Sequence, residues 1–207
     1  MRDFNIEAAT WDANPRQVRL SSEVADAILD TVKVTSDTDV MDFGCGTGLI
    51  AVNLQSRVRS VTCVDNAPGM LEVLEAKIRN HGIENVKTLC ADVSAGGRLE
   101  GRYDLIVSSM ALHHIEDVDG LLVQFAGVLS EGGHICIADL DLEGGRFHTD
   151  SSGVYHNGFD RAALGSAFER AGFEDVCVRT AATVEKPDAD GTLREYAVFL
   201  ISARKKI

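Results

Sequence analysis

The stretch that decides the fold is Asp42-Phe43-Gly44-Cys45-Gly46-Thr47-Gly48, which is followed by the apolar run Leu49-Ile50-Ala51-Val52. Its alternating glycines allow the backbone to turn tightly and to approach a ligand without Cβ atoms in the way. The N-terminus of a helix after the turn presents unpaired N–H groups. The stretch therefore predicts a strand, a ligand-binding turn and a helix in succession.

Outward from this turn, short β-branched runs alternate with longer segments of helical period, which is typical of βαβ units. The runs predict seven strands, at about 39–43, 60–65, 86–90, 103–108, 134–140, 175–180 and 194–202. We therefore expect an α/β fold with a doubly wound sheet. In such sheets ligands bind beyond the carboxyl ends of the strands, where the strand order reverses.

Apolar side chains at helical spacing predict the helices between these strands. Beyond the one after Gly48, they are expected at about 22–32, 68–78, 118–129 and 160–171. Glu131-Gly132-Gly133 is interpreted as the stop of the fourth segment, because glycine readily adopts the left-handed conformation that ends a helix. Asp160 and Gly172 are expected to cap the last one.

The composition is that of an ordinary globular protein of 207 residues, which suits one domain spanning 1–207. The formal charge of −12, from 20 basic and 32 acidic side chains, disfavours nucleic acid as a partner. The basic cluster Arg204-Lys205-Lys206 is interpreted as a solvated tail. No apolar run is long enough for a membrane span, and the N-terminus lacks a secretion signal, so we expect no membrane association and a cytoplasmic location.

The cysteines form no C-x-x-C pair, so their spacing supports neither a zinc site nor a disulfide framework. Four of them lie in strand-like runs, where a free cysteine behaves as a small hydrophobe. These four are Cys63, Cys90, Cys136 and Cys177, while Cys45 lies in the glycine turn.

The glycine turn fits two common nucleotide motifs poorly. A phosphate-binding P-loop needs a lysine followed by serine or threonine, and neither follows here. A dinucleotide-binding G-x-G-x-x-G would need a glycine at 49, where the chain has Leu49.

The pattern D-x-G-x-G-x-G instead resembles the first motif of class I S-adenosylmethionine-dependent methyltransferases. Asp65 follows Gly44 by 21 residues at the end of the second strand, where the family has an acid that binds the ribose hydroxyls. Asn66 to Leu71 resembles the family's D-x-S-x-x-M-L stretch, with Asn66 in place of serine, and implies that Met70 lies near the adenine. The other interpretation of Asp65 is a simple cap of the next helix.

Two further segments extend the resemblance. Asp92 and Val93 follow the third strand, where the family binds adenine, although Asp92 is also a good turn former. The segment Tyr103 to His114 resembles the family's F/Y-D-x-V-x-x-x-x-x-L-H-H stretch, which is common in the small-molecule, methyltransferase type 11-like branch. The resemblance thus implies a Rossmann-like seven-stranded sheet, mostly parallel with an antiparallel last strand and with helices on both faces. The implied cofactor-binding residues are Asp42, Gly44, Cys45, Gly46, Gly48, Asp65, Asn66, Met70, Asp92, Val93 and Ser108.

His113 and His114 are the candidate catalytic residues. An unperturbed imidazole titrates near pH 6.5, which suits proton removal at neutral pH. Histidines at this point of the family also brace the start of the next helix, so both roles stay open.

Two segments are expected to face the substrate. The polar connection at 141–159 is too long for an ordinary strand-to-helix loop, which favours a substrate lid. Residues 1–34 form a leader and helix that we expect to cover the site, although Trp11 could also pack without such a role. The substrate-side candidates are Trp11, Ser109, His148, Tyr155 and His156. His148 and His156 have only generic spacing for a metal, so no metal is expected.

The expected function is in-line transfer of a methyl group from S-adenosylmethionine to a small-molecule acceptor, with S-adenosylhomocysteine as product. An inactive protein that binds the same cofactor is the alternative. An NAD(P)-dependent oxidoreductase is disfavoured by Leu49 and by the lack of a Tyr-x-x-x-Lys pair. The sequence specifies neither the acceptor atom nor the oligomeric state.

Overall fold

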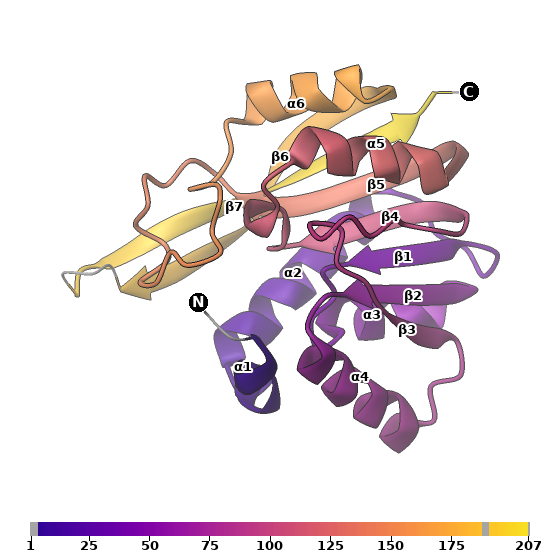
Figure 1. The fold of residues 1–207 in the computed structure, drawn as a ribbon, viewed down its shortest axis with the longest axis horizontal. Coiled ribbons are helices and arrows are strands. Elements are labelled where there is room, and N and C mark those ends of the chain that lie inside the picture. The colour runs from indigo at the N-terminus through magenta and orange to yellow at the C-terminus, as the bar shows by residue number, and fades with distance from the viewer. Residues whose placement is uncertain (1–3, 188–190, 207) are drawn as a thin grey trace.

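The computed structural model describes residues 4–187 and 191–206. Its centre is a seven-stranded sheet with the order β3-β2-β1-β4-β5-β7-β6, shown in Figure 1. The strands are β1 (Asp39–Phe43), β2 (Ser60–Asp65), β3 (Val86–Cys90), β4 (Tyr103–Ser109), β5 (Leu129–Leu140), β6 (Phe173–Pro187) and β7 (Leu193–Lys205). Strands β1 to β5 pair in parallel, and β7 runs antiparallel to both of its neighbours. The expected sheet, mostly parallel with an antiparallel last strand, is confirmed.

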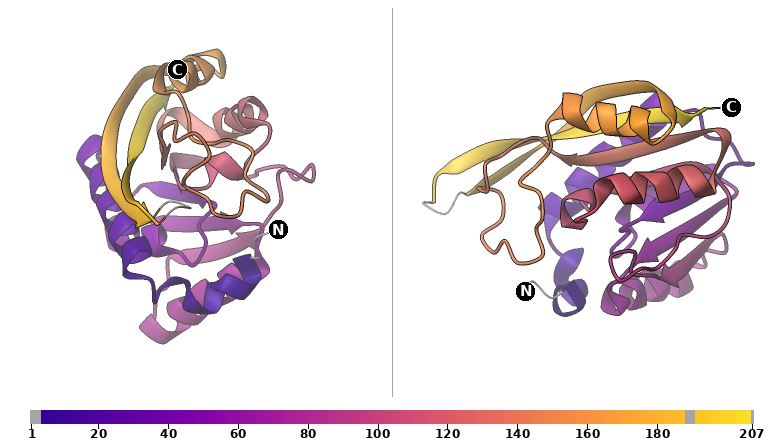
Figure 2. Two further views of the ribbon diagram at one scale, coloured as in Figure 1. Left: turned by 90° about the vertical axis from the view of Figure 1, so that its left-hand side faces the viewer. Right: turned by 45° about the horizontal axis from the view of Figure 1, so that its top comes forward.

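Helices cover both faces of the sheet (Figures 1 and 2). They are α1 (Phe4–Trp11), α2 (Pro15–Thr31), α3 (Leu49–Leu54), α4 (Pro68–His81), α5 (Val118–Val128) and α6 (Arg161–Arg170), with short 3₁₀ turns η1 (Gln55–Arg57) and η2 (Leu112–His114). The predicted start of α2 at residue 22 is wrong. The helix begins at Pro15, where Asn14 Oδ1 accepts the Arg16 N–H at 3.1 Å and proline occupies the first turn.

The predicted glycine stop after α5 is also wrong. Helix α5 ends at Val128 and β5 begins at Leu129, so Glu131-Gly132-Gly133 lies inside β5. Leu129 pairs with Tyr103, and a register shift follows before the next pair. The glycines therefore lie at the irregular start of β5, where a residue in the left-handed conformation bends the ladder of hydrogen bonds between the strands.

The last two strands are longer than predicted. They pair from Phe173 with Lys205 to Pro187 with Leu193, whereas β7 pairs with β5 only from Val198 to Arg204. The far part of this hairpin therefore projects beyond the sheet and curves over it (Figure 2). The strand predicted at 194–202 covers most of β7, whereas the one predicted at 175–180 misses the second half of β6.

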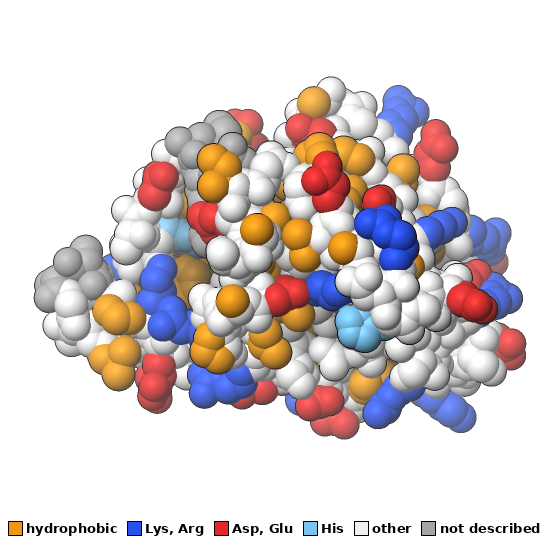
Figure 3. All heavy atoms as spheres, turned by 90° about the horizontal axis from the view of Figure 1, so that it is seen from below, with side chains coloured by type: hydrophobic (Ala, Val, Ile, Leu, Met, Phe, Trp, Pro, Cys, Tyr) orange, Lys and Arg blue, Asp and Glu red, His pale blue; other side chains and the backbone are white. Residues whose placement is uncertain are grey.

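The surface carries both signs of charge. Basic and acidic side chains intersperse over the face in Figure 3, rather than forming a patch of one sign. Within the described residues, no helix is both long and apolar enough to cross a membrane.

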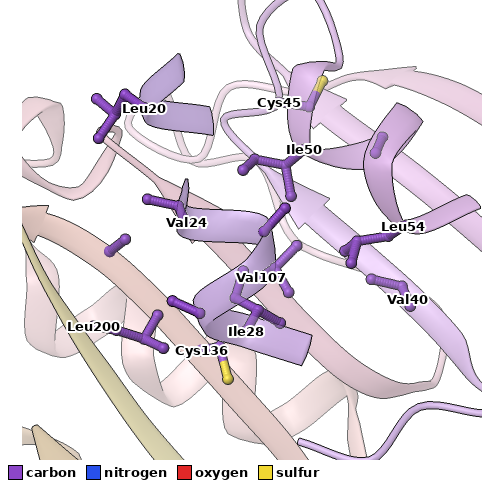
Figure 4. Packing of buried hydrophobic residues seen from close by; sticks show 14 of the residues in the cluster. Leu20, Val24, Ile28, Val40, Cys45, Ile50, Leu54, Val107, Cys136 and Leu200 are labelled. Atoms are coloured by element: carbon purple, nitrogen blue, oxygen red, sulfur yellow. The ribbon is translucent and has the colours of Figure 1, made fainter. Parts of the chain in front are cut away.

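Two apolar layers flank the sheet. In one layer α2 and α3 pack on the strands, and Figure 4 shows Val24 and Ile28 of α2 above Val107 and Cys136. The other layer contains Phe125 of α5, together with side chains of α6. The prediction of apolar burial holds for Cys63 and Cys136 but is wrong for Cys90 and Cys177, which are exposed. These two lie on β3 and β6, the edge strands of the sheet.

Candidate functional site

A pocket of about 600 Å³ lies at the carboxyl ends of the parallel strands. Its wall includes Gly44 after β1, Asp65 at the end of β2, Asp92 after β3 and Ser109 at the end of β4. Strand β1 has β2 on one side and β4 on the other, so the strand order reverses here. This is the position at which doubly wound sheets bind their ligands.

The glycine turn has three residues with positive φ, at +67° for Gly44, +53° for Gly46 and +78° for Gly48. A Cβ on Gly44 would come within 2.3 Å of Ala111 Cβ, and one on Gly48 within 2.4 Å of Leu74 Cδ1. Those two glycines are required by packing, and Gly48 is not on the pocket wall.

Gly46 differs from its neighbours, because it has no such close contact. A Cβ there would meet only Met70 Sδ, at 4.0 Å, and both residues line the pocket. The turn therefore presents bare backbone to the pocket at Gly46, which leaves room for a ligand to lie against it.

Asp65 holds the turn while facing the pocket. Its Oδ2 accepts the Gly46 N–H at 2.7 Å and its Oδ1 accepts the Ala67 N–H at 2.9 Å. Burial raises the pKa of this carboxyl group, against the lowering effect of those N–H donors. The bond to Ala67 closes the turn before α4 and does not cap that helix, because its N-cap is Ala67 itself and has no side-chain cap. The lone pairs that remain on a carboxylate can accept ligand hydroxyl groups.

Asp42 is the buried acid of the turn. It is 1% exposed and lines the pocket, and its Oδ2 has no hydrogen-bond partner among the described residues. Burial, followed by the nearby charge of Asp65, raises its pKa to about 7. A buried carboxyl oxygen without a partner needs a compensating group, and a cationic ligand would supply one.

The other predicted cofactor residues divide into two groups. Those on the pocket wall are Cys45, Asn66, Met70, Asp92 and Val93. Asp92 Oδ1 also accepts the N–H groups of Ser94 and Ala95, so it forms a turn as well. Ser108 is buried, with its Oγ unpartnered, and is absent from the wall, whereas Ser109 lines it.

His113 forms a buried pair with Asp139, a residue that sequence patterns did not single out. His113 Nδ1 lies 2.7 Å from Asp139 Oδ1, and the side chains are 1% and 0% exposed. Asp139 also accepts the backbone N–H groups of His113 and Leu140. A carboxylate only accepts, so His113 Nδ1 carries a proton, and in the neutral ring the lone pair is on Nε2. Within the part of the chain that the structure describes, His113 Nε2 has no hydrogen-bond partner, and His113 lines the pocket.

His114 is placed differently. Its Nδ1 lies 2.7 Å from the Gly153 carbonyl oxygen, and its ring meets Phe4 edge-on at 5.3 Å between centroids. His114 lines the pocket, but it also joins the 141–159 connection to α1. His114 therefore ties two segments of the pocket wall together, which is a different role from the predicted bracing of the next helix.

The connection at 141–159 forms the opposite wall. Phe147, His148 and Tyr155 line the pocket, and the His113 carbonyl accepts the Tyr155 N–H at 3.0 Å. His156 does not line the pocket. Its Nε2 lies 2.9 Å from the Ile115 carbonyl oxygen and its ring packs on Phe159, so it ties the connection to the domain.

The N-terminal segment completes the wall through Phe4 and Trp11. Helix α1 is attached to α4, because Asn5 Oδ1 accepts the Gly69 N–H at 2.8 Å. Asp12 accepts the Thr47 hydroxyl and pairs with Lys77, each at 2.6 Å. The leader is thus fastened to both the glycine turn and α4.

Two cations on the wall were missed by sequence reasoning, Arg16 at the start of α2 and Lys186 near the tip of the β6–β7 hairpin. They are 170 residues apart and lie in ordinary amphipathic segments, so no spacing signal joins them. In the described part of the chain, no group of three or more His, Cys, Asp or Glu side chains is placed to hold a metal ion.

The sequence is similar to those of methyltransferases. A family model described as a methyltransferase domain matches residues 40–133. An uncharacterized methyltransferase of Schizosaccharomyces pombe is 26% identical, over 83% of this chain and 77% of its own. Aklanonic acid methyltransferase DauC of Streptomyces is 26% identical over 70% of this chain and 66% of its own.

A solved structure shares the fold over the whole chain. Phosphoethanolamine N-methyltransferase 2 of Haemonchus contortus, in complex with S-adenosyl-L-methionine, superposes with a TM-score of 0.73. The match covers 100% of this chain and 61% of that one, at 16% identity.

Proposed function

Since the chain belongs to the class I S-adenosylmethionine-dependent methyltransferases, we propose that it binds S-adenosylmethionine in this pocket and methylates a small-molecule acceptor. The observation that carries the proposal is the open backbone at Gly46, bounded by Met70, Asp65 and the unpartnered oxygen of Asp42. These groups fit an adenosyl sulfonium, which has ribose hydroxyls to donate, an apolar ring to bury and a positive charge.

Each of these residues has a proposed task. Asp65 would accept the ribose hydroxyls, while Met70 and Val93 would contact the adenine. Asp42 would face the cationic part of the cofactor, where ionisation of the carboxyl group is favoured by an opposite charge. When bound, the cofactor supplies an electrophilic methyl group.

Side chains of the protein would align the acceptor and remove its proton. The pocket aligns the acceptor with the methyl group, and alignment alone can account for several kcal/mol of a barrier. His113 Nε2 would take the acceptor's proton, and Asp139 would hold the ring in the tautomer that leaves this nitrogen basic. His114, held by Gly153, would shape the wall rather than move a proton.

A small acceptor fits the dimensions and the charge of the protein. A pocket of about 600 Å³ lies within the usual range for small-molecule sites. The net charge of −12 opposes binding of a phosphate backbone. The names of the Streptomyces and Haemonchus relatives refer to small acceptors, in line with this proposal.

Calorimetric titration with S-adenosylmethionine, S-adenosylhomocysteine and NADH tests the proposal. The first two should bind with one site per chain, and Asp65→Ala should weaken them by roughly 1–3 kcal/mol, or about 5- to 150-fold in Kd. Incubation with a metabolite panel should then yield S-adenosylhomocysteine in the presence of an acceptor. Binding of NADH alone, or unchanged affinity in a folded Asp65→Ala variant, would refute the assignment.

A further inference from the structure

The charged side chains that line the pocket are segregated by sign. The acids on the wall are Asp42, Asp65 and Asp92, and all of them belong to the turn and strand ends assigned to the cofactor. The basic side chains on the wall are Arg16, His113, His114, His148 and Lys186, and they come from α2, η2, the 141–159 connection and β6. We infer that the methyl acceptor carries an oxyanion, a carboxylate or a phosphate, which Arg16 and Lys186 bind. This inference rests on the proposed function.

Of the two cations, Arg16 gives the stronger support for an oxyanion site. It lies in the first turn of α2, is half-buried and lines the pocket. The described residues provide no hydrogen bond or ion pair to its guanidinium, although the chain has 32 acids for 20 basic side chains. Arg19, one turn further along the same helix, pairs with Glu23 at 3.8 Å. A guanidinium presents a planar fork of donors that matches an oxyanion.

Lys186 reaches the pocket because the β6–β7 hairpin extends beyond the sheet. Its ammonium donates to the Phe147 carbonyl and lies 4.7 Å from the centroid of the Phe147 ring. These contacts position the charge against the 141–159 connection, which supplies His148 to the same wall. The part of the hairpin that does not pair with β5 thus places a cation on the pocket wall.

The rest of this wall indicates an acceptor with an apolar or aromatic body. Phe4, Trp11, Phe147 and Tyr155 all line the pocket. The net charge of −12 repels an anion at long range. An anionic acceptor must therefore be bound by cations close to the site. The class of acceptor is therefore a small aromatic or hydrophobic acid, with the group to be methylated near His113.

The cofactor's own carboxylate is the rival occupant for these cations, and binding measurements separate the two. Titrations of S-adenosylhomocysteine and 5′-methylthioadenosine, which lacks the amino-acid part, are made with wild type, Arg16→Gln and Lys186→Gln. We expect each variant to change the affinity for both nucleosides by less than threefold. Selective weakening of S-adenosylhomocysteine binding would assign the cations to the cofactor and overturn the inference, while leaving the proposed function intact.

The acceptor arm uses matched probes with protein saturated in S-adenosylhomocysteine. The pairs are benzoate with benzamide, 4-hydroxybenzoate with 4-hydroxybenzamide, and phenyl phosphate with phenol. We expect the anion to bind at least tenfold more tightly than its neutral partner in one or more pairs. That preference should fall at least fivefold in Arg16→Gln and Lys186→Gln and persist in the control Arg19→Gln.

The outcomes are distinguishable. Equal or absent binding across all three pairs would overturn the inference, and so would a preference that survives when Arg16→Gln and Lys186→Gln are combined in one variant. Failure of wild type to bind S-adenosylhomocysteine at all would instead refute the proposed function. A carboxylate preference without a phosphate preference, or the reverse, would identify which oxyanion the site takes.

Discussion

The two halves of the pocket are built in different ways. The cofactor half comes from residues 42–93, at the ends of three neighbouring parallel strands. The acceptor half comes from α1, the start of α2, η2, the 141–159 connection and the β6–β7 hairpin. The first half is positioned by sheet hydrogen bonds and short turns, whereas the second depends on individual side-chain contacts between distant segments. Under the proposed function, the sheet would fix where the cofactor binds, while the identity of the acceptor would depend on segments that can vary independently of it.

The largest expected effect lies in the acceptor half, at its two histidines. His113→Ala should lower kcat by about 10²- to 10⁴-fold with an acceptor that must lose a proton, because the group paired with Asp139 is removed. His114→Ala should lower kcat less, since His114 braces Gly153 and Phe4. Steady-state kinetics with an acceptor identified in the metabolite panel would check this.

Asp139→Asn refines the same test. The amide can donate as well as accept, so it no longer enforces a proton on His113 Nδ1. The kcat value should fall, while cofactor affinity stays within about threefold. Equal losses in the His113→Ala and His114→Ala variants would remove the distinction between base and brace.

The next prediction concerns the glycines of the cofactor half. Gly44→Ala should lower the free energy of unfolding by about 2–5 kcal/mol, since it combines a left-handed backbone with a Cβ that collides with Ala111. Gly46→Ala should cost only about 1–2 kcal/mol, from the backbone alone, but should abolish cofactor binding. Urea denaturation and calorimetry check the pair. Normal cofactor affinity in folded Gly46→Ala would contradict the open face assigned to this residue.

A third prediction uses the buried acid Asp42. Its pKa is raised from 3.8 to about 7, so the folded protein retains a proton that the unfolded chain loses at lower pH. This contribution to stability is fully present below pH 3.8 and is lost as the pH rises through about 7. The free energy of unfolding of wild type should therefore fall by a few kcal/mol relative to Asp42→Asn between these limits. Parallel pH profiles for the two proteins would contradict this account.

Cofactor binding should be linked to the same proton. A cationic ligand favours the ionised carboxylate, so binding near pH 6.5 should release protons, part of them from Asp42. Calorimetry in buffers of different ionisation enthalpy would measure the release. Asp42→Asn should reduce it, and an undiminished release would place the proton elsewhere.

The smallest expected effect is at the link between the two halves. Lys77 joins Asp12 of the leader to the carbonyl oxygen of Thr47 in the glycine turn. Lys77→Ala should cost about 1 kcal/mol of stability, because the pair is only partly buried, and should weaken cofactor affinity a few-fold. Arg79→Ala on the same helix, which removes an exposed pair with Glu75, is the matched control. Identical affinities in the two variants would show that the leader is not coupled to the turn.

The same contrast explains what could be predicted from the sequence. The strand ends at Phe43, Asp65 and Cys90 were predicted to the residue, because apolar runs stop where a ligand-binding turn starts. Helix α1 was missed, since it buries little more than Ala8 of its own and acquires its place from contacts with α4. Gly48 was predicted to bind the cofactor, but it is a glycine because a Cβ there would collide with Leu74 of α4. A local glycine pattern does not show a contact with a separate helix.

The acceptor half was harder to predict for a physical reason. Asp139 could be noticed only as an acid at the end of a buried strand, since its pairing with His113 spans 26 residues and depends on the position of η2. Arg16 and Lys186 occupy positions that a solvated helix or hairpin would also give to cations. That both line one pocket depends on the length of the β6–β7 hairpin, which carries Lys186, and no local pattern encodes that length.

The most direct test of the central claim is a crystal structure of the chain with S-adenosylhomocysteine. We predict that the adenosyl group lies against the bare backbone at Gly46, with Met70 beside it and the ribose hydroxyl groups within hydrogen-bonding distance of Asp65. A ligand bound elsewhere, or a glycine turn closed by side chains in the presence of saturating ligand, would contradict the account.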